Sequence, residues 1–236
     1  MVAARIAWLV FIRADSRRLP GKCYLDISGK NVLGWLSTRS GEAGVNKKDI
    51  FLCTSEKESN ELIISQARQL GHNVLLGPEE YPVQRISENW DRLSGYKFIV
   101  RICGDSPMYP FRYVRHVVDM LERYDPVAIT NTRLRNFPSG FSIEVYEATY
   151  LRNFFEENMV LTEQEHMSTI LRDKPFVDSH RTMDISSACG FDIFEESRYT
   201  LDIAEDLVVL RSCLMDRKDK AYEDTLLTIP LDHGSR

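Results

Sequence analysis

The chain has 236 residues and a formal net charge of −5 at neutral pH. Hydrophobic residues make up 43% of it and charged residues 28%, which allows one large core inside an ordinary hydrophilic surface. The acidic balance argues against a general nucleic-acid-binding protein, and no stretch approaches the ~18 apolar residues of a membrane span.

The predicted elements alternate between strands and helices over the first 130 residues. Short apolar runs are typical of strands buried on both faces, and they predict strands at residues 6–12, 50–54, 74–76, 98–102 and 127–129. Helices are predicted between these strands at residues 32–39, 57–70, 83–93 and 111–123. This alternation indicates an α/β protein with a parallel sheet and right-handed crossovers.

The strand–helix alternation stops after residue 130. Beyond a turn at residues 137–140, the patterns predict a strand at 141–146, helices at 148–157 and 163–172, and a last helix at 204–215. We interpret residues 131–184 as an insertion that forms a substrate-binding lobe and a dimer contact. The insertion belongs to a single domain over residues 1–236, a length that fits one domain.

Five cysteines are spread along the chain without a Cys-x-x-Cys pair: Cys23, Cys53, Cys103, Cys189 and Cys213. Their odd number and wide spacing indicate neither a disulfide framework nor a zinc site, so a reducing cytoplasm is expected. The apolar run at residues 6–12 is at the short limit for a signal peptide, and charged residues follow where small ones are needed. We therefore predict a soluble, cytoplasmic protein.

A turn rich in basic residues follows the first predicted strand. Pro20 fixes φ, Gly21 permits a positive φ, and Ser16 can cap free amides. Four cations lie within ten residues, namely Arg13, Arg17, Arg18 and Lys22. A flexible loop with donors and cations at the carboxyl end of a first strand suits a polyphosphate. On these residues alone, an ordinary basic surface loop is the alternative.

Asp105 directly follows the fourth predicted strand, at the edge of the sheet where ligands bind in α/β proteins. Gly104 allows a close approach there, and a carboxylate can hold Mg²⁺ against phosphate oxygens. The alternative is that Asp105 caps a turn before Pro107.

Asp202 precedes the last predicted helix. With Glu205 three residues later, it has the spacing of a helix N-cap followed by an acidic N3 residue. The carboxylate of Asp202 can also be a second metal ligand, and both roles can coexist. Two carboxylates are the minimum that Mg²⁺ sites use together with substrate phosphates.

Three motifs resemble those of the CMP-sugar synthetases, the family of deoxy-octulosonate and acylneuraminate cytidylyltransferases, and in particular the cytidylyltransferase-like proteins of spore-coat polysaccharide biosynthesis. The first is Arg-x-x-Ser-x-Arg-Leu-Pro-Gly-Lys at residues 13–22. The others are Arg-x-x-Gly-Asp-x-Pro at 101–107 and Tyr-Thr-x-Asp-x-x-Glu-Asp-Leu at 199–207. The resemblance implies a three-layer α/β/α nucleotide-diphospho-sugar transferase fold, Rossmann-like, with a mostly parallel sheet.

The resemblance also implies an activity. The protein would transfer CMP from CTP to an acidic sugar in surface polysaccharide biosynthesis, release pyrophosphate, use Mg²⁺ and form a homodimer, without nucleic-acid or membrane partners. Asp105 and Asp202 would hold Mg²⁺, and the catalytic residues would be Lys22, Arg13 and Asp105. The residues implied to bind the nucleotide are Arg13, Ser16, Arg18, Gly21, Lys22, Arg85 and Asp105. Those implied to bind the substrate are Arg101, Asn131, Gly140, Glu144, Glu165 and His166. A structural role is the alternative for His166.

Several positions depart from the family pattern: Phe11, Asp15 and Gln84 stand where relatives often have Gln, Gly and Asp. Asp15 would repel a triphosphate unless it points away or pairs with Arg17 or Arg18. Two alternatives therefore stay open. The protein uses another nucleotide or a phosphorylated non-sugar acceptor, or it is a catalytically silent paralogue that binds nucleotide or a partner enzyme. Retention of both motif carboxylates favours an active transferase.

Overall fold

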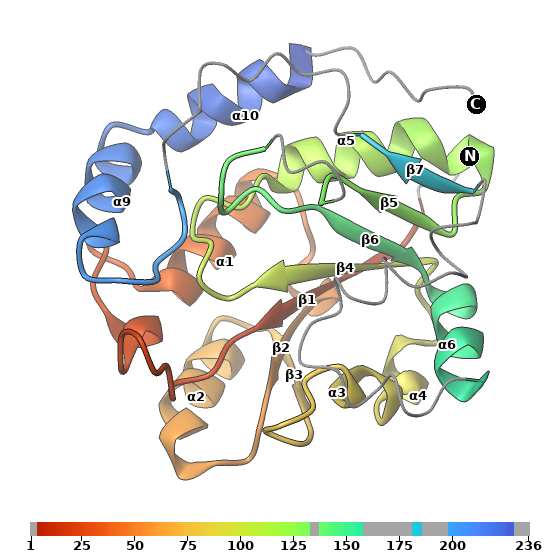
Figure 1. The fold of residues 1–236 in the computed structure, drawn as a ribbon, viewed down its shortest axis with the longest axis horizontal. Helices are drawn as coiled ribbons and strands as arrows, with labels where there is room; N and C mark the ends of the chain where they lie inside the picture. The colour runs from red at the N-terminus through yellow and green to blue at the C-terminus, as the bar shows by residue number, and fades with distance from the viewer. Residues whose placement is uncertain (1–3, 133–136, 158–180, 186–197, 229–236) are drawn as a thin grey trace.

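The computed structural model describes residues 4–132, 137–157, 181–185 and 198–228. A seven-stranded sheet forms its middle layer, in the order β3-β2-β1-β4-β6-β5-β7 (Figure 1). The strands are β1 (Ile6–Phe11), β2 (Ile50–Thr54), β3 (Asn73–Leu76), β4 (Phe98–Cys103), β5 (Ala128–Thr130), β6 (Glu144–Glu147) and β7 (Thr182–Asp184). All pairings are parallel except those of β6, which runs antiparallel to β4 and β5. The predicted mostly parallel α/β sheet is confirmed.

Most of the helices lie in the connections between strands, and α9 and α10 follow β7. They are α1 (Val32–Glu42), α2 (Glu61–Gln69), α3 (Gln84–Ser87), α4 (Trp90–Leu93), α5 (Phe111–Leu121), α6 (Ala148–Glu157), α9 (Asp206–Met215) and α10 (Lys218–Thr228). The single helix predicted at 83–93 is wrong. The backbone of Asn89 is not helical, and its side-chain amide donates to the carbonyls of Leu76 (3.1 Å) and Arg85 (2.8 Å).

Two further expectations concern the second half of the chain. The helix predicted at 204–215 begins at Asp206 and is not the last one, because α10 follows it. The strand predicted at 141–146 is β6, and it joins the central sheet between β4 and β5. The helix predicted at 163–172 lies outside the described residues.

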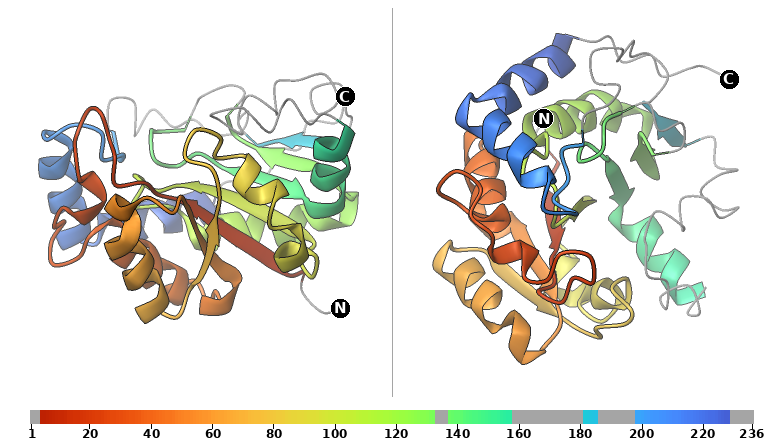
Figure 2. Two further views of the ribbon diagram at one scale, coloured as in Figure 1. Left: turned by 90° about the horizontal axis from the view of Figure 1, so that it is seen from below. Right: turned by 60° about the vertical axis from the view of Figure 1, so that its left-hand side comes forward.

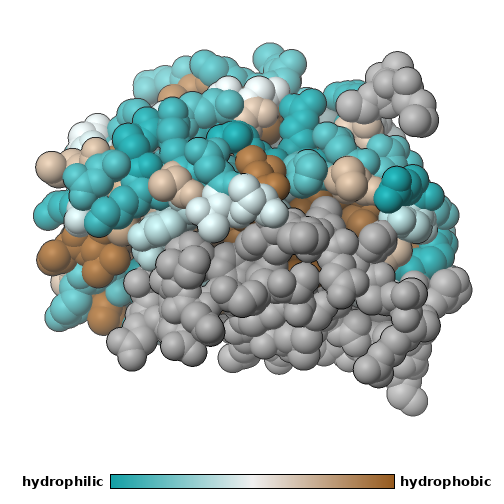
Figure 3. All heavy atoms as spheres, turned by 90° about the horizontal axis from the view of Figure 1, so that it is seen from above, coloured by the Kyte–Doolittle hydropathy of each residue, from teal (hydrophilic) through white to brown (hydrophobic). Residues whose placement is uncertain are grey.

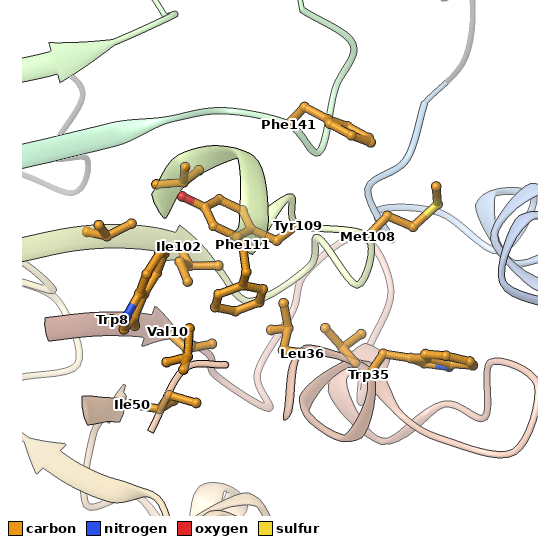
Figure 4. Close-up of a cluster of buried hydrophobic side chains, with 14 of the residues drawn as sticks. Trp8, Val10, Trp35, Leu36, Ile50, Ile102, Met108, Tyr109, Phe111 and Phe141 are labelled. Atoms are coloured by element: carbon orange, nitrogen blue, oxygen red, sulfur yellow. The ribbon is translucent and has the colours of Figure 1, made fainter. Parts of the chain in front are cut away.

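Alternate residues of β1 belong to two different cores, which gives the fold its three layers (Figure 2). Trp8 and Val10 pack on one face of the sheet with α1, α2, α5, α9 and α10. Leu9 packs on the other face with α3, α4 and α6. In the first core the rings of Trp8 and Phe111 lie 5.1 Å apart, surrounded by aliphatic side chains from β1, β4 and α1 (Figure 4). The apolar run of β1 is therefore explained by burial on both sides.

The strand order creates a switch point between β1 and β4. From β1 the chain builds β2 and β3 on one side of the sheet, and β4 then pairs on the other side of β1. Loops that leave such neighbouring strands at their carboxyl ends diverge, and a crevice opens between them. The topology thus predicts a ligand site at the ends of β1 and β4.

A buried group of ionic side chains attaches α10 to α1 and to the first turn of α5. The guanidinium of Arg39 in α1 contacts Asp219, and its Nη2 lies 3.0 Å from Glu223 Oε2. Glu223 also accepts the amide of Tyr113 (3.1 Å), in the first turn of α5, whose N-cap residue Pro110 gives no side-chain cap. The side chains of Arg39, Asp219 and Glu223, which we call the Arg39 cluster, are 1%, 0% and 6% exposed. The cluster therefore stabilises the packing of α10 against the two helices that it contacts.

The outer surface is mostly hydrophilic. Figure 3 shows hydrophobic atoms at the left edge of one face, the end of the molecule where α9 lies in Figure 1. The exposed apolar residues of α9 are Val208, Val209 and Met215. In the part of the chain that the structure describes, no helix has the length and apolarity to cross a membrane.

Candidate active site

The crevice at the switch point is a pocket of about 490 Å³ between the loops that follow β1 and β4. The amide of Gly104 donates to the carbonyl of Phe11 (2.9 Å), and a Cβ on Gly104 would overlap both that carbonyl and Ile12. Only glycine permits this close approach. As a result, Asp105 lies beside the loop that follows β1. The pocket is lined by Phe11, Arg13, Lys22, Arg101 and Asp105, among others.

The loop after β1 folds back on itself. Gly21 has φ +65°, and its amide donates to the carbonyl of Ala14 (3.2 Å). Ser16 Oγ accepts the amide of Leu19 (3.4 Å). A short 3₁₀ turn, η1 (Lys22–Tyr24), begins directly after Gly21. The expected positive φ of Gly21 and the capping role of Ser16 are confirmed, and both hold Lys22 at the edge of the crevice.

Lys22 joins two carboxylates that are far apart in the sequence. Its Nζ lies 3.0 Å from Asp105 Oδ2 and 3.0 Å from Asp202 Oδ1. The amide of Leu201 donates to the main-chain carbonyl of Asp105 (2.7 Å), which brings the second motif to the first. The side chains of Lys22, Asp105 and Asp202 are 16%, 24% and 14% exposed. The structure therefore brings together the three residues that the motifs singled out.

Two arginines share the carboxylate of Asp202. Arg18 Nη2 lies 2.9 Å from Oδ1, and Arg198 Nη2 lies 3.4 Å from Oδ2. Arg198 was missed from the sequence, although it directly precedes the motif at residues 199–207 and lies four residues before Asp202. We call Lys22, Arg18, Asp105 and Asp202 the Lys22 cluster.

Asp206 orients Asp202. The carboxylate of Asp206, the first residue of α9, accepts the amide of Asp202 (2.7 Å) and that of the next residue (2.9 Å). The predicted capping role of Asp202 is therefore wrong, since α9 begins later and Asp206 satisfies these amides. The sequence contains a signal for the later start of α9, because an acidic residue such as Asp206 is favoured in the first turn of a helix. The carboxylate of Asp202 is left to face the basic loop.

A second pocket, of about 650 Å³, adjoins the first, and both are lined by Arg13, Ser16 and Arg17. Its other wall contains Glu79, which accepts a hydrogen bond from Ser55 Oγ. Asn60 connects this wall to the loop after β1, because it donates to Ser55 Oγ (2.9 Å) and accepts the amide of Ala14 (2.8 Å). The two walls of the second pocket are thus tied together.

Asp15 and Arg85 both lie near the second pocket. Asp15 pairs with Lys57 (3.3 Å), and both side chains are half exposed, so its partner is neither Arg17 nor Arg18. Arg85 is buried behind the pocket and donates to the carbonyls of Pro78 (2.9 Å) and Glu79 (3.1 Å). Burial lowers the pKa of Arg85. Arg85 supports the loop, and its contact with a nucleoside stays a prediction.

Arg101 and Glu144 form the floor of the first pocket. Arg101 Nη1 lies 2.9 Å from Glu144 Oε1, and the Tyr146 hydroxyl donates to Glu144 Oε2 (3.1 Å). The guanidinium of Arg101 also lies 5.9 Å from the ring centre of Phe11. Glu144 is almost fully buried, so it positions Arg101, which lines the pocket.

The other predicted substrate residues have structural contacts. The side-chain nitrogen of Asn131 donates to the carbonyl of Phe141 (2.8 Å), and its side-chain oxygen accepts the backbone amide of Ile143 (2.8 Å). Gly140 has φ +100° and packs against the carbonyl of Tyr199. Both hold the connection into β6, while their role in substrate binding stays a prediction. Glu165 and His166 lie outside the described residues.

The site offers charges rather than a protein nucleophile. Burial raises the pKa of the Cys103 thiol to about 12 and that of the Cys23 thiol to about 11, so both thiols that line this pocket are neutral at physiological pH. Among the described residues there is no group of three or more His, Cys, Asp or Glu that could hold a metal ion. Asp105 and Asp202 nevertheless converge on one cation, the Lys22 ammonium, which fits a metal ion shared with ligand oxygens.

A mostly parallel sheet with a crevice at its switch point, bordered by a cationic loop and two carboxylates, is typical of α/β proteins that bind nucleotides. A family model described as "Cytidylyltransferase" matches residues 7–211. The chain belongs to this cytidylyltransferase family of CTP-dependent nucleotidyltransferases, as the three motifs predicted.

Known proteins similar to the chain agree with this family. The spore coat polysaccharide biosynthesis protein SpsF of Bacillus subtilis (strain 168) is 24% identical over 206 residues, which cover 85% of this chain and 82% of the relative. A cytidylyltransferase structure from Leptospira borgpetersenii has a TM-score of 0.79 at 20% identity, over 99% of both chains. The structure of CMP:2-keto-3-deoxy-manno-octonic acid synthetase complexed with CTP has a TM-score of 0.59 at 18% identity, over 91% of this chain and 100% of that one. These structures confirm the fold.

Proposed function

We propose that the protein transfers CMP from CTP to an acidic sugar, with release of pyrophosphate, in the biosynthesis of a surface polysaccharide. One observation carries the proposal: Lys22 lies 3.0 Å from both Asp105 and Asp202, at the sheet edge where nucleotides bind. Two similar proteins supply the acceptor class. SpsF is named for spore coat polysaccharide biosynthesis, and the structure with CTP is of a synthetase named for an octonic acid.

The triphosphate would lie along the loop that follows β1. Arg13, Ser16, Arg18 and Lys22 line the first pocket and offer cations and a hydroxyl to its oxygens. An acceptor oxygen then forms a bond to the α-phosphorus, while the bond to the bridging oxygen of the departing pyrophosphate breaks. Such a displacement needs positioning and charge stabilisation, which Lys22 and Arg13 supply to the equatorial and leaving oxygens.

Asp105 and Asp202 would hold Mg²⁺. A bound metal ion supplies Lewis-acid polarisation of phosphate oxygens and offsets the charge of the leaving pyrophosphate. Asp206 keeps the carboxylate of Asp202 oriented through the adjacent amides. Both carboxylates already converge on the Lys22 ammonium, which lines the pocket, before any ligand arrives.

The acceptor would bind on the floor of the first pocket. Arg101 offers a guanidinium there, held by Glu144 and placed within reach of Phe11. A planar guanidinium matches a carboxylate in two-point geometry, which suits an acidic sugar. Homodimer formation, through residues 131–184, is part of the same proposal.

The test begins with nucleotide choice. Thermal unfolding is measured with CTP, UTP, GTP and ATP, each with and without Mg²⁺; a ligand at a hundredfold excess over its Kd stabilises by about 2.7 kcal/mol. We expect a Mg²⁺-dependent shift with CTP. Pyrophosphate release is then followed with CTP and a panel of sugar acids, and light scattering reports whether the mass is twice 27.3 kDa.

Two outcomes would change the proposal. A shift with another nucleotide, or release only with a phosphorylated non-sugar acceptor, would keep the fold and replace the reaction. No shift and no release would favour a silent paralogue. Pairing of Asp15 with Lys57 argues against that last possibility, because the acid of the phosphate loop already has a cation outside the loop.

A further inference from the structure

The cations of the Lys22 cluster lie where a metal ion would be expected. The Lys22 ammonium lies between two carboxylate oxygens at 3.0 Å each, and Arg18 lies 2.9 Å from one of the same oxygens. We propose that Lys22 and Arg18 hold the metal position in the ligand-free protein and move onto the phosphates when nucleotide binds. A divalent cation and a triphosphate then enter the site as one unit.

In the ligand-free site, the carboxylates of Asp105 and Asp202 are paired with the cations of Lys22 and Arg18. Entry of a metal ion alone or of a triphosphate alone would break this pairing at a cost in free energy. Asp105 and Asp202 are only 24% and 14% exposed. A partly buried carboxylate that loses its cation pays a desolvation penalty without compensation. Each carboxylate must therefore exchange one cation for another.

A divalent cation alone would meet the ammonium of Lys22. Two like charges within a few ångströms repel strongly in a partly buried site. Lys22 would have to leave, and without phosphate it would find no new anion in the pocket. The free protein should bind divalent cations weakly.

A triphosphate alone would create the opposite imbalance. Its oxygens would draw Lys22 and Arg18 away. Asp105 would then keep the Ser106 hydroxyl (3.2 Å) and Asp202 the more distant Arg198 (3.4 Å), and both carboxylates would face the negative charge of the ligand. With both ligands present, the metal ion takes the carboxylates and the side-chain cations take the phosphates. Every charge is then paired.

The side chains have the freedom that this exchange needs. The Arg18 side chain is 65% exposed, so little packing holds it to Asp202. Lys22 carries a point charge on a flexible four-carbon stem. By linkage, the phosphates should tighten metal binding by the same factor by which the metal tightens phosphate binding.

The experiment measures Mn²⁺ binding by the full chain, through the electron paramagnetic resonance signal of free Mn²⁺. Three variants each remove one positive charge from the same loop: Lys22→Met, Arg18→Met and Arg17→Met. Arg17 is the matched control, because it is exposed and, among the described residues, forms no ion pair with either carboxylate. Circular dichroism confirms that each variant is folded.

Without phosphate, Lys22→Met should bind Mn²⁺ more tightly than wild type, within the range of about 5- to 150-fold that is usual for coupled ligands. Arg18→Met should show a smaller gain, and Arg17→Met a change of no more than about twofold, because an exposed charge has little effect at a distance. Inorganic tripolyphosphate should tighten Mn²⁺ binding to wild type, and less so to Lys22→Met. If Lys22→Met does not fold, the exposed Arg18→Met variant decides the first comparison.

The proposal is overturned if the folded Lys22→Met and Arg18→Met variants bind Mn²⁺ no tighter than Arg17→Met in the absence of phosphate. The measurement of Mn²⁺ binding without phosphate contains no nucleotide, so its result does not depend on the proposed reaction. The exchange is supported even if CTP then proves to be the wrong nucleotide. A stabilising shift with CTP would conversely preserve the proposed function if the exchange fails. The refinement that the metal ion enters with the nucleotide rests on that proposed function.

Discussion

The Lys22 cluster and the Arg39 cluster are built from the same kinds of side chain, yet they differ in what holds their carboxylates. In the Arg39 cluster all side chains are buried, and Glu223 also accepts a backbone amide at the start of α5. In the Lys22 cluster the side chains are partly exposed, and no backbone amide among the described residues donates to the carboxylates of Asp105 or Asp202.

This difference separates fixed charges from exchangeable ones. A buried carboxylate bonded to both a guanidinium and a helix end cannot change partner without breaking the fold. A carboxylate that accepts only side-chain donors near solvent, as Asp105 does from Lys22 (3.0 Å) and the Ser106 hydroxyl (3.2 Å), can exchange its cation for a ligand. Removal of a member of the Arg39 cluster should therefore affect stability, and removal of a member of the Lys22 cluster should affect activity.

The largest effect is expected from Asp105→Asn. Loss of one preorganised charge at a reaction centre costs about 10²–10³-fold in rate, so pyrophosphate release should fall by that factor. The free energy of unfolding should change by less than about 1 kcal/mol, because the lost ion pair is partly exposed. Asp15→Asn removes an acid of the loop after β1 that lies outside the Lys22 cluster; it is the control and should retain most activity. Equal losses in both variants would contradict the assignment.

Arg39→Met should produce the reverse pattern. It leaves Asp219 and Glu223 buried without their guanidinium, which costs about 3–5 kcal/mol in the free energy of unfolding. Denaturant titration measures this loss, and the rate per folded molecule should stay close to that of wild type. Arg152→Met is the control, since Arg152 is 53% exposed and pairs with the similarly exposed Glu156 at 2.8 Å; its loss should cost at most about 1 kcal/mol. Similar costs for the two variants would refute the contrast.

Gly104→Ala should affect both properties. Its Cβ would overlap Ile12 and the carbonyl of Phe11, so β1 and β4 must separate at their ends. Overpacking of this kind costs about 1–3 kcal/mol, and the displacement of Asp105 should lower the rate as well. Gly41→Ala is the control, because open space surrounds Gly41 in α1 and alanine favours a helix. A Gly104→Ala variant with normal stability and rate would show that the strands need not approach so closely.

The smallest effect is expected from Ser55→Ala. It removes the hydrogen bonds of Ser55 Oγ to Glu79 and Asn60, at a cost of about 0.5–1.5 kcal/mol in the free energy of unfolding. Because these bonds tie the two walls of the second pocket together, calorimetry should show a several-fold weaker affinity for CTP. Ser59→Ala, at an exposed position nearby, should change neither value. Unchanged CTP affinity in Ser55→Ala would remove the second pocket from the nucleotide site.

The first half of the fold could be predicted because its signals are local. A run buried on both faces marks β1, and the turn with Gly21 follows it directly. Gly104 and Asp105 follow β4 in the same way, so the sheet edge brings both loops together. Each of these elements needs only its own neighbours in the sequence.

The rest depends on contacts between distant residues. Asp105 and Asp202 lie close together because the amide of Leu201 donates to the main-chain carbonyl of Asp105. No local pattern in the sequence encodes that hydrogen bond. The antiparallel direction of β6 is decided by its insertion between β4 and β5. Arg39 lies in a helix where an arginine would ordinarily be exposed, and its partners, the carbonyl of Tyr109 and the acids of α10, are distant in the sequence.

The late position of Asp202 has a consequence for protein synthesis. The ribosome adds about 5–20 residues per second, and 97 residues separate Asp105 from Asp202. A nascent chain could therefore form β1 to β4 and the basic loop several seconds before its second carboxylate exists. During that interval the site lacks its second carboxylate, so the two acids can meet at Lys22 only after the segment around Asp202 has been made.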